Sequence, residues 1–210
     1  MPKPVITVDD IRAVEPGGVL PVPAEAIVTD LAREMAQANR ISLVVHDHLT
    51  TAVSSAGSGP TLAIGADHGP SLPMKEALKP YLAELGYTVL DCGTFTPEAV
   101  DYPDIAYAVA RQVANGTVWR GIIIDGAGIG SCMAANKVPG IRAALCYNEA
   151  MARNSREHND ANVLTLGAGM IGLNLARQIV ETWLKTDFGG GRHQRRVNKI
   201  VEIEQRFLKG

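Results

Sequence analysis

The sequence Gly121-Ile122-Ile123-Ile124-Asp125-Gly126-Ala127-Gly128-Ile129-Gly130 joins a short apolar segment to a loop with glycine at every second position. An apolar run of this length that ends at a turn is typical of a strand buried on both faces of a parallel sheet. Glycine lets the loop backbone approach a ligand and point its N–H groups at it. Residues 131–136 are expected to start a helix, whose N-terminus favours an anion.

The alternative for this loop is a tight strand-to-helix turn without a ligand, and the glycine spacing alone does not choose between the two. The spacing differs from the dinucleotide-binding fingerprint, because the third glycine comes too early and no ribose-binding acid is identifiable. A nucleotide cofactor is therefore not predicted.

On both sides of this stretch, short apolar segments alternate with amphipathic ones. This alternation predicts an α/β fold with a parallel sheet covered by helices on both faces. Strands are expected at residues 61–66, 87–91, 121–124, 142–146 and 162–167, and helices at residues 73–85, 102–115, 149–158 and 173–185, with a short helix after residue 130.

The chain divides near residue 60. Residues 50–60 are small, polar and rich in serine and glycine, which is typical of a linker. The linker separates an N-terminal extension, residues 1–49, from a domain formed by residues 61–210.

The extension has a helical pattern of its own. Thr7 is followed three residues later by Asp10, as at the start of a helix. Ile27, Leu31 and Met35 recur every four residues and predict an amphipathic helix of about three turns. So short a segment is not expected to bury a core alone, and we expect it to dock on its own domain or on a partner.

Composition excludes several classes of function. The chain has 210 residues and a formal net charge of −2, which gives no general attraction to nucleic acid or to an acidic membrane. No apolar run reaches the roughly 18 residues of a spanning helix, and no secretory signal pattern opens the chain. Cys92, Cys132 and Cys146 are far apart and form no CxxC pair, which indicates reduced thiols in a cytoplasmic protein without a zinc site.

Polar clusters mark where chemistry is expected. In open parallel sheets, ligands bind beyond the carboxyl ends of the strands. Asp67 and His68 follow the first predicted strand, and Asp125 follows the third. A third cluster, residues 156–159 with His158, directly precedes the last strand, so it is also compatible with the opposite edge. Taken alone, His68 would more often be a structural histidine, and His158 is equally compatible with either role.

A basic cluster lies near the C-terminus. Arg192 and Arg196 are four residues apart and share one face of a helix. Two guanidinium groups on one face suit a phosphate. The alternative is a solvated basic helix, which the spacing alone favours.

Taken together and in order, these segments resemble the type B ribose-5-phosphate isomerase family, which includes the galactose-6-phosphate isomerase subunits. Five motifs carry the resemblance, and they cover essentially all of residues 61–210. The motifs are GADHG at 65–69, DYPD at 101–104, GIG at 128–130 with AANKVPGIRA at 134–143, REHNDANV at 156–163, and GGRHQRRV at 190–197.

The resemblance implies a Rossmann-like three-layer α/β/α sandwich, working as a homodimer or tetramer with sites shared between subunits. It implies no metal and no cofactor. The expected reaction interconverts an aldose phosphate and a ketose phosphate through an enediolate, as a base moves a proton between C2 and C1.

By motif, the resemblance also assigns roles to residues. His158 would help to open the furanose ring, and Tyr102 would belong to the substrate-binding residues. The sugar hydroxyls would be held by Asp67, His68 and Asn159, the phosphate by Arg192, His193 and Arg196 from a neighbouring subunit, and the enediolate oxygens by the N–H groups of residues 126–130, including Gly126, Gly128 and Gly130.

The chain departs from the family pattern in several places. Asp125 stands where the family has its usual cysteine base, and Ala127 where it has a threonine. Some members use a glutamate at the position of Ser131, and a phosphate-binding arginine is replaced by Gly169. An Asp has a similar reach to Cys and can take a proton from carbon and return it, so Asp125 is the expected base. Cys132 is a nearby thiol but is seven positions further on.

Two functions from different classes fit these departures. The first is an active aldose–ketose isomerase, of the ribose 5-phosphate/ribulose 5-phosphate type, with Asp125 as a carboxylate base. The second is a catalytically inactive sugar-phosphate-binding or scaffold homologue.

The N-terminal extension carries a second, shorter resemblance. Residues 20–23 and 27–33 look like extensions seen on some bacterial microcompartment enzymes. This implies a contact with a microcompartment shell or its cargo through residues 1–49. The alternative is a helix that caps its own domain.

Overall fold

The structure is a computed structural model that describes residues 5–12, 14–23, 26–46, 52–54 and 59–208. The chain forms two compact units, Met1–Thr50 and Thr51–Gly210. Each unit is described by itself below. Within the described residues, no helix is both long enough and apolar enough to cross a membrane.

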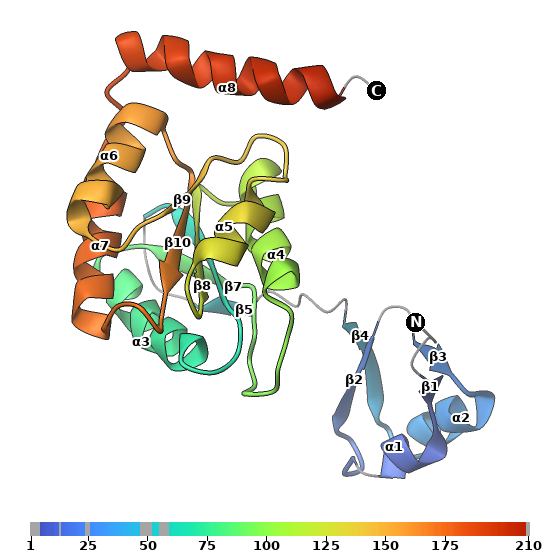
Figure 1. The fold of residues 1–210 in the computed structure, drawn as a ribbon. Coiled ribbons are helices and arrows are strands. Elements are labelled where there is room, and N and C mark those ends of the chain that lie inside the picture. The colour runs from blue at the N-terminus through green and yellow to red at the C-terminus, as the bar shows by residue number, and fades with distance from the viewer. Residues whose placement is uncertain (1–4, 13, 24–25, 47–51, 55–58, 209–210) are drawn as a thin grey trace. The chain divides into compact units, whose positions relative to one another are not determined.

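The larger unit is built on a six-stranded sheet with the strand order β5-β7-β6-β8-β10-β9 (Figure 1). Five neighbouring strands are parallel, and β5 pairs with β7 in the antiparallel direction. The strands are β5 (Ala52–Ser54), β6 (Thr61–Ala66), β7 (Thr88–Asp91), β8 (Arg120–Asp125), β9 (Ala143–Leu145) and β10 (Val163–Gly167).

Helices cover both faces of this sheet, so the fold is the predicted three-layer α/β/α sandwich. Figure 1 shows α3, α6 and α7 on one face and α4 and α5 on the other, with α8 beyond the end of α6. The helices are α3 (Ser71–Glu84), α4 (Tyr102–Ala114), α5 (Ile129–Ala135), α6 (Glu149–Asn159), α7 (Leu173–Lys185) and α8 (Arg192–Leu208).

The two faces of the sheet pack differently. On the face under α3 and α7, large side chains such as Leu62, Ile122 and Trp183 form the main core and are fully buried. On the other face, a Cβ at Gly121 would lie 2.6 Å from a methyl group of Val109 in α4. Glycine therefore lets α4 pack directly on the central strand that leads into the glycine loop.

The smaller unit contains two pairs of parallel strands, β1 with β3 and β2 with β4, together with two helices. Ile11, Ala32, Ala36 and Ile41 form a buried cluster within it. The expectation that this segment cannot bury a core alone was therefore wrong. The elements are β1 (Val5–Ile6), α1 (Val8–Arg12), β2 (Val19–Pro23), β3 (Ile27–Val28), α2 (Asp30–Ala38) and β4 (Ser42–His46).

The helix predicted around Ile27, Leu31 and Met35 exists but has a different buried face. The Thr29 hydroxyl accepts the N–H of Ala32 and caps α2, which begins at Asp30, three residues after Ile27. Ile27 therefore lies in β3, and Leu31 is 61% exposed. Two alanines, Ala32 and Ala36, form the buried face instead.

The predicted helix start at Thr7 is confirmed. Its backbone N–H donates to the Asp10 carboxylate at 2.7 Å, and its hydroxyl donates to the same oxygen. Part of the predicted linker, in contrast, is a strand. β5 pairs with β7 from Ala52 opposite Asp91 to Ser54 opposite Val89, whereas residues 50, 51 and 55–58 lie outside the described residues.

Candidate active site

The carboxyl edge of the sheet brings two acidic residues together, as the sequence predicted. β6 and β8 are neighbours with Ala66 opposite Ile124, so Asp67 and Asp125 end adjacent strands. The N–H of Asp67 donates to the carbonyl of Ile124 at 3.1 Å. Adjacent parallel strands lie about 4.8 Å apart, so the two carboxylates share one small region.

The Asp125 carboxylate is buried and bound by the glycine loop. Its Oδ1 accepts the N–H of Ala127 at 2.8 Å and the N–H of Gly128, and its Oδ2 accepts the N–H of Ser131 at 3.0 Å. These donors include loop amides expected to stabilise an enediolate. The candidate base and the candidate oxyanion hole therefore hydrogen-bond to each other.

Contacts with β9 and β10 hold the glycine loop in place. Gly128 has φ of +76°, and a Cβ there would lie 2.4 Å from a methyl group of Leu145. The Thr165 hydroxyl donates to the Gly128 carbonyl at 2.9 Å. Only glycine combines this backbone conformation with this close approach, so the amides are held in one direction.

Asp67 lies in a different environment from Asp125. Its side chain is buried, and Oδ1 has no hydrogen-bond partner among the described residues. Burial raises the pKa of Asp67, and the charge of Asp125 raises it further. The neighbouring His68 is exposed, and its Nδ1 accepts the N–H of Val100 at 3.4 Å.

Tyr102 also reaches the loop. It begins α4 at the same edge of the sheet, and its ring lies so close to Gly130 that a Cβ there would be 2.5 Å from a ring carbon. The ring is 42% exposed. Tyr102 therefore lies against one side of the loop.

A buried lysine supports this edge and was missed by the sequence analysis. Lys75 is fully buried in α3 and donates to both oxygens of Asp91, at 2.7 and 3.0 Å, and to the Thr94 carbonyl at 2.6 Å. This ion pair ties α3 to the loop that leads towards Tyr102. The sequence did contain a signal for this buried lysine. Lys75 lies among the apolar positions of the helix, next to Met74 and three residues before Leu78.

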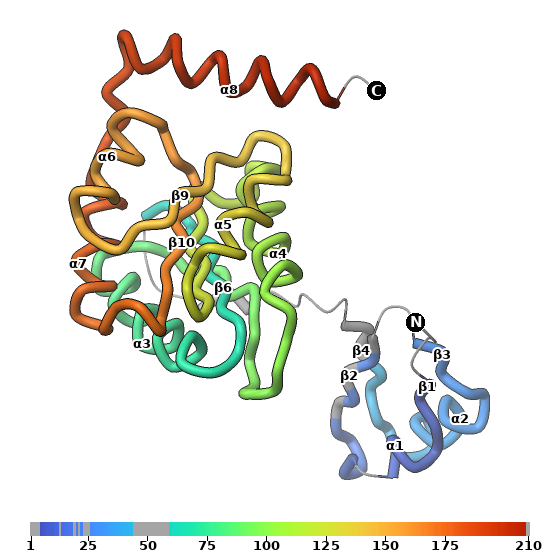
Figure 2. The backbone as a smooth tube through the Cα atoms, viewed as in Figure 1, coloured from blue at the N-terminus to red at the C-terminus, as the bar shows by residue number. Residues whose placement is uncertain are grey.

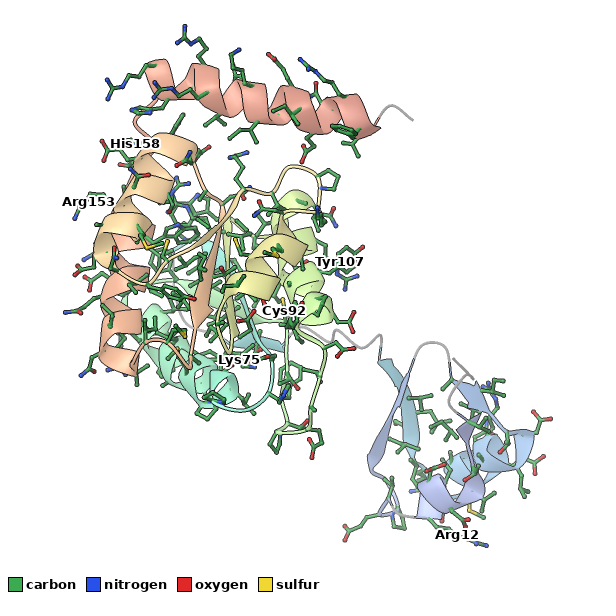
Figure 3. The ribbon with its side chains drawn as sticks, in the orientation of Figure 1. Arg12, Lys75, Cys92, Tyr107, Arg153 and His158 are labelled. Carbon is green, nitrogen blue, oxygen red and sulfur yellow. The ribbon has the colours of Figure 1, made fainter. Side chains whose placement is uncertain are left out.

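The remaining predicted residues gather at the opposite edge. α6 begins after β9 and ends just before β10, so His158 and Asn159 lie at the amino ends of the strands. The His158 ring stacks on His193 with a centroid distance of 4.2 Å and an interplanar angle of 6°. Figure 2 shows the end of α6 beside the start of α8, and Figure 3 shows His158 there and Lys75 at the other end of the sheet.

The start of α8 is strongly basic. Arg192 and Arg196 are exposed, and neither guanidinium has an acidic partner among the described residues. His193 is buried between them and α6. Burial lowers the pKa of His193, and the charges of His158, Arg192 and Arg196 lower it further. A dianion bound here would satisfy all of these groups at once.

The predicted residues therefore form two half-sites in one chain. The carboxyl-edge half-site contains Asp67, His68, Tyr102 and residues 125–130, and the amino-edge half-site contains His158, Asn159, Arg192, His193 and Arg196. The five residues of β10 separate them by about 13 Å or more. The sequence left either edge open for the His158 cluster, and the structure places it at the amino edge, because a helix that precedes a parallel strand ends at that strand's amino end.

The structure shows the surroundings of Gly169, which replaces a family arginine, and of Cys132, the thiol nearest in sequence to Asp125. The N–H of Gly169 donates to the carbonyl of Gly126 at 2.9 Å, and a Cβ at Gly169 would lie 2.9 Å from that same oxygen. A larger residue at 169 would thus displace the loop. Burial raises the pKa of the Cys132 thiol, whose Sγ donates to the Ala143 carbonyl at 3.4 Å, which makes it a poor replacement base.

Comparison with known proteins assigns the chain to a family of sugar-phosphate isomerases. The model of the Ribose/Galactose Isomerase family matches residues 62–200. The chain belongs to this family.

Individual relatives agree in sequence and in structure. Ribose-5-phosphate isomerase B of Escherichia coli strain K12 is 47% identical over 145 residues, which is 69% of this chain and 97% of the relative. D-erythrulose-4-phosphate isomerase of Pectobacterium atrosepticum is 43% identical over 145 residues, 69% and 95% of the two chains. The solved Ribose-5-Phosphate Isomerase B of Clostridium thermocellum has a TM-score of 0.68 and 54% identity, over 70% of this chain and 99% of the other.

Proposed function

We propose that this protein interconverts an aldose phosphate and a ketose phosphate, of the ribose 5-phosphate/ribulose 5-phosphate type, through an enediolate. The observation that carries the proposal is the position of Asp125, whose carboxylate lies within hydrogen-bond distance of the loop amides. A proton acceptor next to donors for a developing oxyanion is what enolisation beside a carbonyl requires. The names of the relatives support this substrate class.

In this mechanism, Asp125 is the base that moves a proton between C2 and C1. The N–H groups that bind its carboxylate in the free chain also serve the enediolate. A sugar oxygen that takes the amides of Ala127 and Gly128 frees Asp125 to accept a proton from carbon. Binding of the substrate thus also releases the Asp125 carboxylate from its loop hydrogen bonds.

The other residues have roles that follow from their chemistry. His158, with a ring nitrogen 2.9 Å from the Asn154 amide, moves a proton during opening of the furanose ring. Arg192, His193 and Arg196 bind the phosphate. The sugar hydroxyls are held by Asp67, His68, Tyr102 and Asn159.

A complete site needs a second copy of the chain, because one chain keeps its half-sites apart. The exposed face of α8 supports such an assembly. Ile200, Ile203 and Phe207 follow one another at helical spacing and are 45%, 55% and 84% exposed. We infer a homodimer or tetramer in which the amino edge of one chain meets the carboxyl edge of another.

An inactive sugar-phosphate binder is the second candidate. The hydrogen bonds of the Asp125 carboxylate favour it, because a carboxylate that only caps its own loop performs no chemistry. The test is to measure turnover and binding of the purified protein with a panel of pentose and hexose phosphates. Turnover of at least one member is expected, and binding without turnover across the panel would leave only the second candidate.

The smaller unit is proposed as a contact module of a cytoplasmic protein. It lies outside the residues that the family model matches, has its own buried cluster, and exposes Val5, Ile27 and Leu31. Contact with a microcompartment shell or cargo would be tested by fusing residues 1–50 to a fluorescent protein and following its recruitment to assembled shells, with a Leu31→Asp variant as control.

A further inference from the structure

Two carboxylates end neighbouring strands at the carboxyl edge, and their surroundings differ. Both oxygens of Asp125 accept backbone N–H groups. Oδ1 of Asp67 is buried and has no hydrogen-bond partner among the described residues. A buried acceptor without a partner is rare and costly, so a native protein that keeps one needs a reason for it. The Ser71 hydroxyl, also buried and without a hydrogen-bond partner in the described part of the chain, is the polar side chain that acts on Asp67 and lowers its pKa. Protonation would turn the Asp67 side chain into a hydrogen-bond donor.

The proposed reaction needs a second proton route besides the one at carbon. Converting an aldose into a ketose moves one hydrogen from C2 to C1 and another from O2 to O1. Residues 126–128, in the loop next to Asp125, are Gly, Ala and Gly and offer no side-chain group for the second transfer. The Ser131 hydroxyl beyond them is buried without a partner among the residues that the structure describes, but an alcohol is a much poorer general acid than a carboxyl group. His68 is exposed, and its Nδ1 already accepts the Val100 N–H.

We propose that Asp67 is the acid–base catalyst that carries the proton between O1 and O2 of the sugar. The inference rests on the proposed function, and it goes beyond holding a sugar hydroxyl. Two neighbouring carboxylates in unlike environments commonly divide such work, one staying ionised and the other holding a proton.

The steps balance with one proton shared between the two carboxyl groups. Asp125 takes the proton from C2, and the C2–H pair forms the C1–C2 double bond. The π pair of the C1 carbonyl moves to O1, which takes the proton of Asp67 and completes an enediol. Asp67 then removes the proton from O2 as the C2 carbonyl forms, and the double-bond pair at C1 takes the proton back from Asp125. Both carboxyl groups end in their starting states.

The environment of Asp67 suits this role. Burial raises the pKa of Asp67, the Ser71 hydroxyl lowers it, and the neighbouring charge of Asp125 raises it, so that the net direction is upward. As pH rises, Asp67 loses the proton that O1 needs. The mechanism therefore predicts that kcat falls on the alkaline side as this carboxyl group ionises.

The experiment compares full-length Asp67→Asn, Asp67→Glu and Asp67→Ala with wild type. The substrate is ribose 5-phosphate or another aldose or ketose phosphate that the wild-type protein turns over. Asp104→Asn, an exposed carboxylate at the same edge of the sheet, is the matched control. Asp67→Asn is expected to lower kcat by at least about 100-fold and to remove the alkaline fall of kcat, while sugar-phosphate binding persists. Asp67→Glu should restore part of kcat with a shifted alkaline fall, and formate should rescue Asp67→Ala.

The outcomes separate this inference from the proposed function. A wild-type protein without turnover on any sugar phosphate would overturn the proposed function itself. Turnover by wild type together with a near-normal kcat and an unchanged pH profile in Asp67→Asn would overturn the role of Asp67 alone. Loss of binding rather than of kcat, without rescue by formate, would reduce Asp67 to a hydroxyl-binding residue.

Discussion

At the residue scale, the proposed mechanism depends on how the Asp125 carboxylate divides its hydrogen bonds between its own loop and a substrate. Asp125→Asn keeps the shape of the side chain and removes its basicity. We expect kcat to fall by at least about 100-fold, the low end of general-base contributions. Steady-state kinetics measures this, and calorimetric titration with the sugar phosphate should show that binding survives.

Near-normal kcat in Asp125→Asn would remove Asp125 from the mechanism. A fold control is needed, because an Asn cannot accept the Ser131 N–H with its amide nitrogen as the carboxylate Oδ2 does. Losing a hydrogen bond of this kind typically costs about 1–3 kcal/mol of stability. Thermal unfolding of the variant shows whether any loss of activity reflects unfolding.

Phosphate binding is a second residue-scale prediction. Arg196→Ala should weaken sugar-phosphate binding by roughly 10- to 150-fold, because a lost hydrogen bond to a charged group costs about 1.5–3 kcal/mol. Arg206→Ala, at the far end of α8, is the matched control and should bind normally. Unchanged binding in Arg196→Ala would assign the arginines to a solvated helix face.

The raised pKa of Asp67 also predicts how the stability of the folded chain depends on pH. Its pKa is raised in the folded chain, so its ionised form is disfavoured there. Its favourable contribution is present below the ordinary value of 3.8 and is lost as pH rises through the raised pKa. Asp67→Asn should therefore raise Tm relative to wild type at pH 7, and this advantage should shrink at a pH below 3.8. An equal effect at both pH values would contradict the raised pKa.

At the scale of elements, the larger unit could be largely predicted because buried parallel strands read as short apolar runs. The strand at residues 61–66 and the helix at residues 173–185 have the predicted bounds. β5 was missed because Ala52-Val53-Ser54 is too short and too small to stand out from a linker. The face of α2 was wrong because the Thr29 cap, rather than the spacing of large apolar residues, sets where the helix begins.

The candidate site was predictable to a similar degree. Asp67 and Asp125 follow apolar runs, and the ends of adjacent parallel strands meet at one edge. The hydrogen bonds of the Asp125 carboxylate to its loop depend on backbone directions that residue types do not specify. The position of His158 required knowing which way α6 runs, and the Lys75–Asp91 pair joins residues 16 positions apart.

Because β5 pairs with β7, the endpoint of an N-terminal deletion decides whether the sheet of the larger unit stays complete. Deleting residues 1–50 keeps β5 on β7, and we expect the larger unit to retain its Tm and its sugar-phosphate binding. Deleting residues 1–58 removes β5 and leaves β7 as an open edge strand, which favours association between sheets. Light scattering and thermal unfolding of the two deletions should differ. Loss of folding or of the oligomer in the shorter deletion would make residues 1–50 part of the enzyme domain.

At the scale of the whole molecule, the proposed function needs two copies of the chain to build one site. The sheet holds an acid-bearing loop at its carboxyl edge and the basic cluster proposed to bind phosphate at its amino edge, on opposite ends of β8 and β10. The stacked rings of His158 and His193 join α6 to α8 in the amino-edge half-site. Exposed apolar residues along α8 then suit contact with another chain.

The most direct test co-expresses Asp125→Asn and Arg196→Ala chains, each of which is expected to be defective alone. If sites are shared in a two-fold dimer, a mixed dimer holds one site with both defects and one site with neither. An unselected mixture should then regain about one quarter of the wild-type kcat/KM, since half of the dimers are mixed. A mixture no more active than the average of the two variants would contradict a site assembled from two chains.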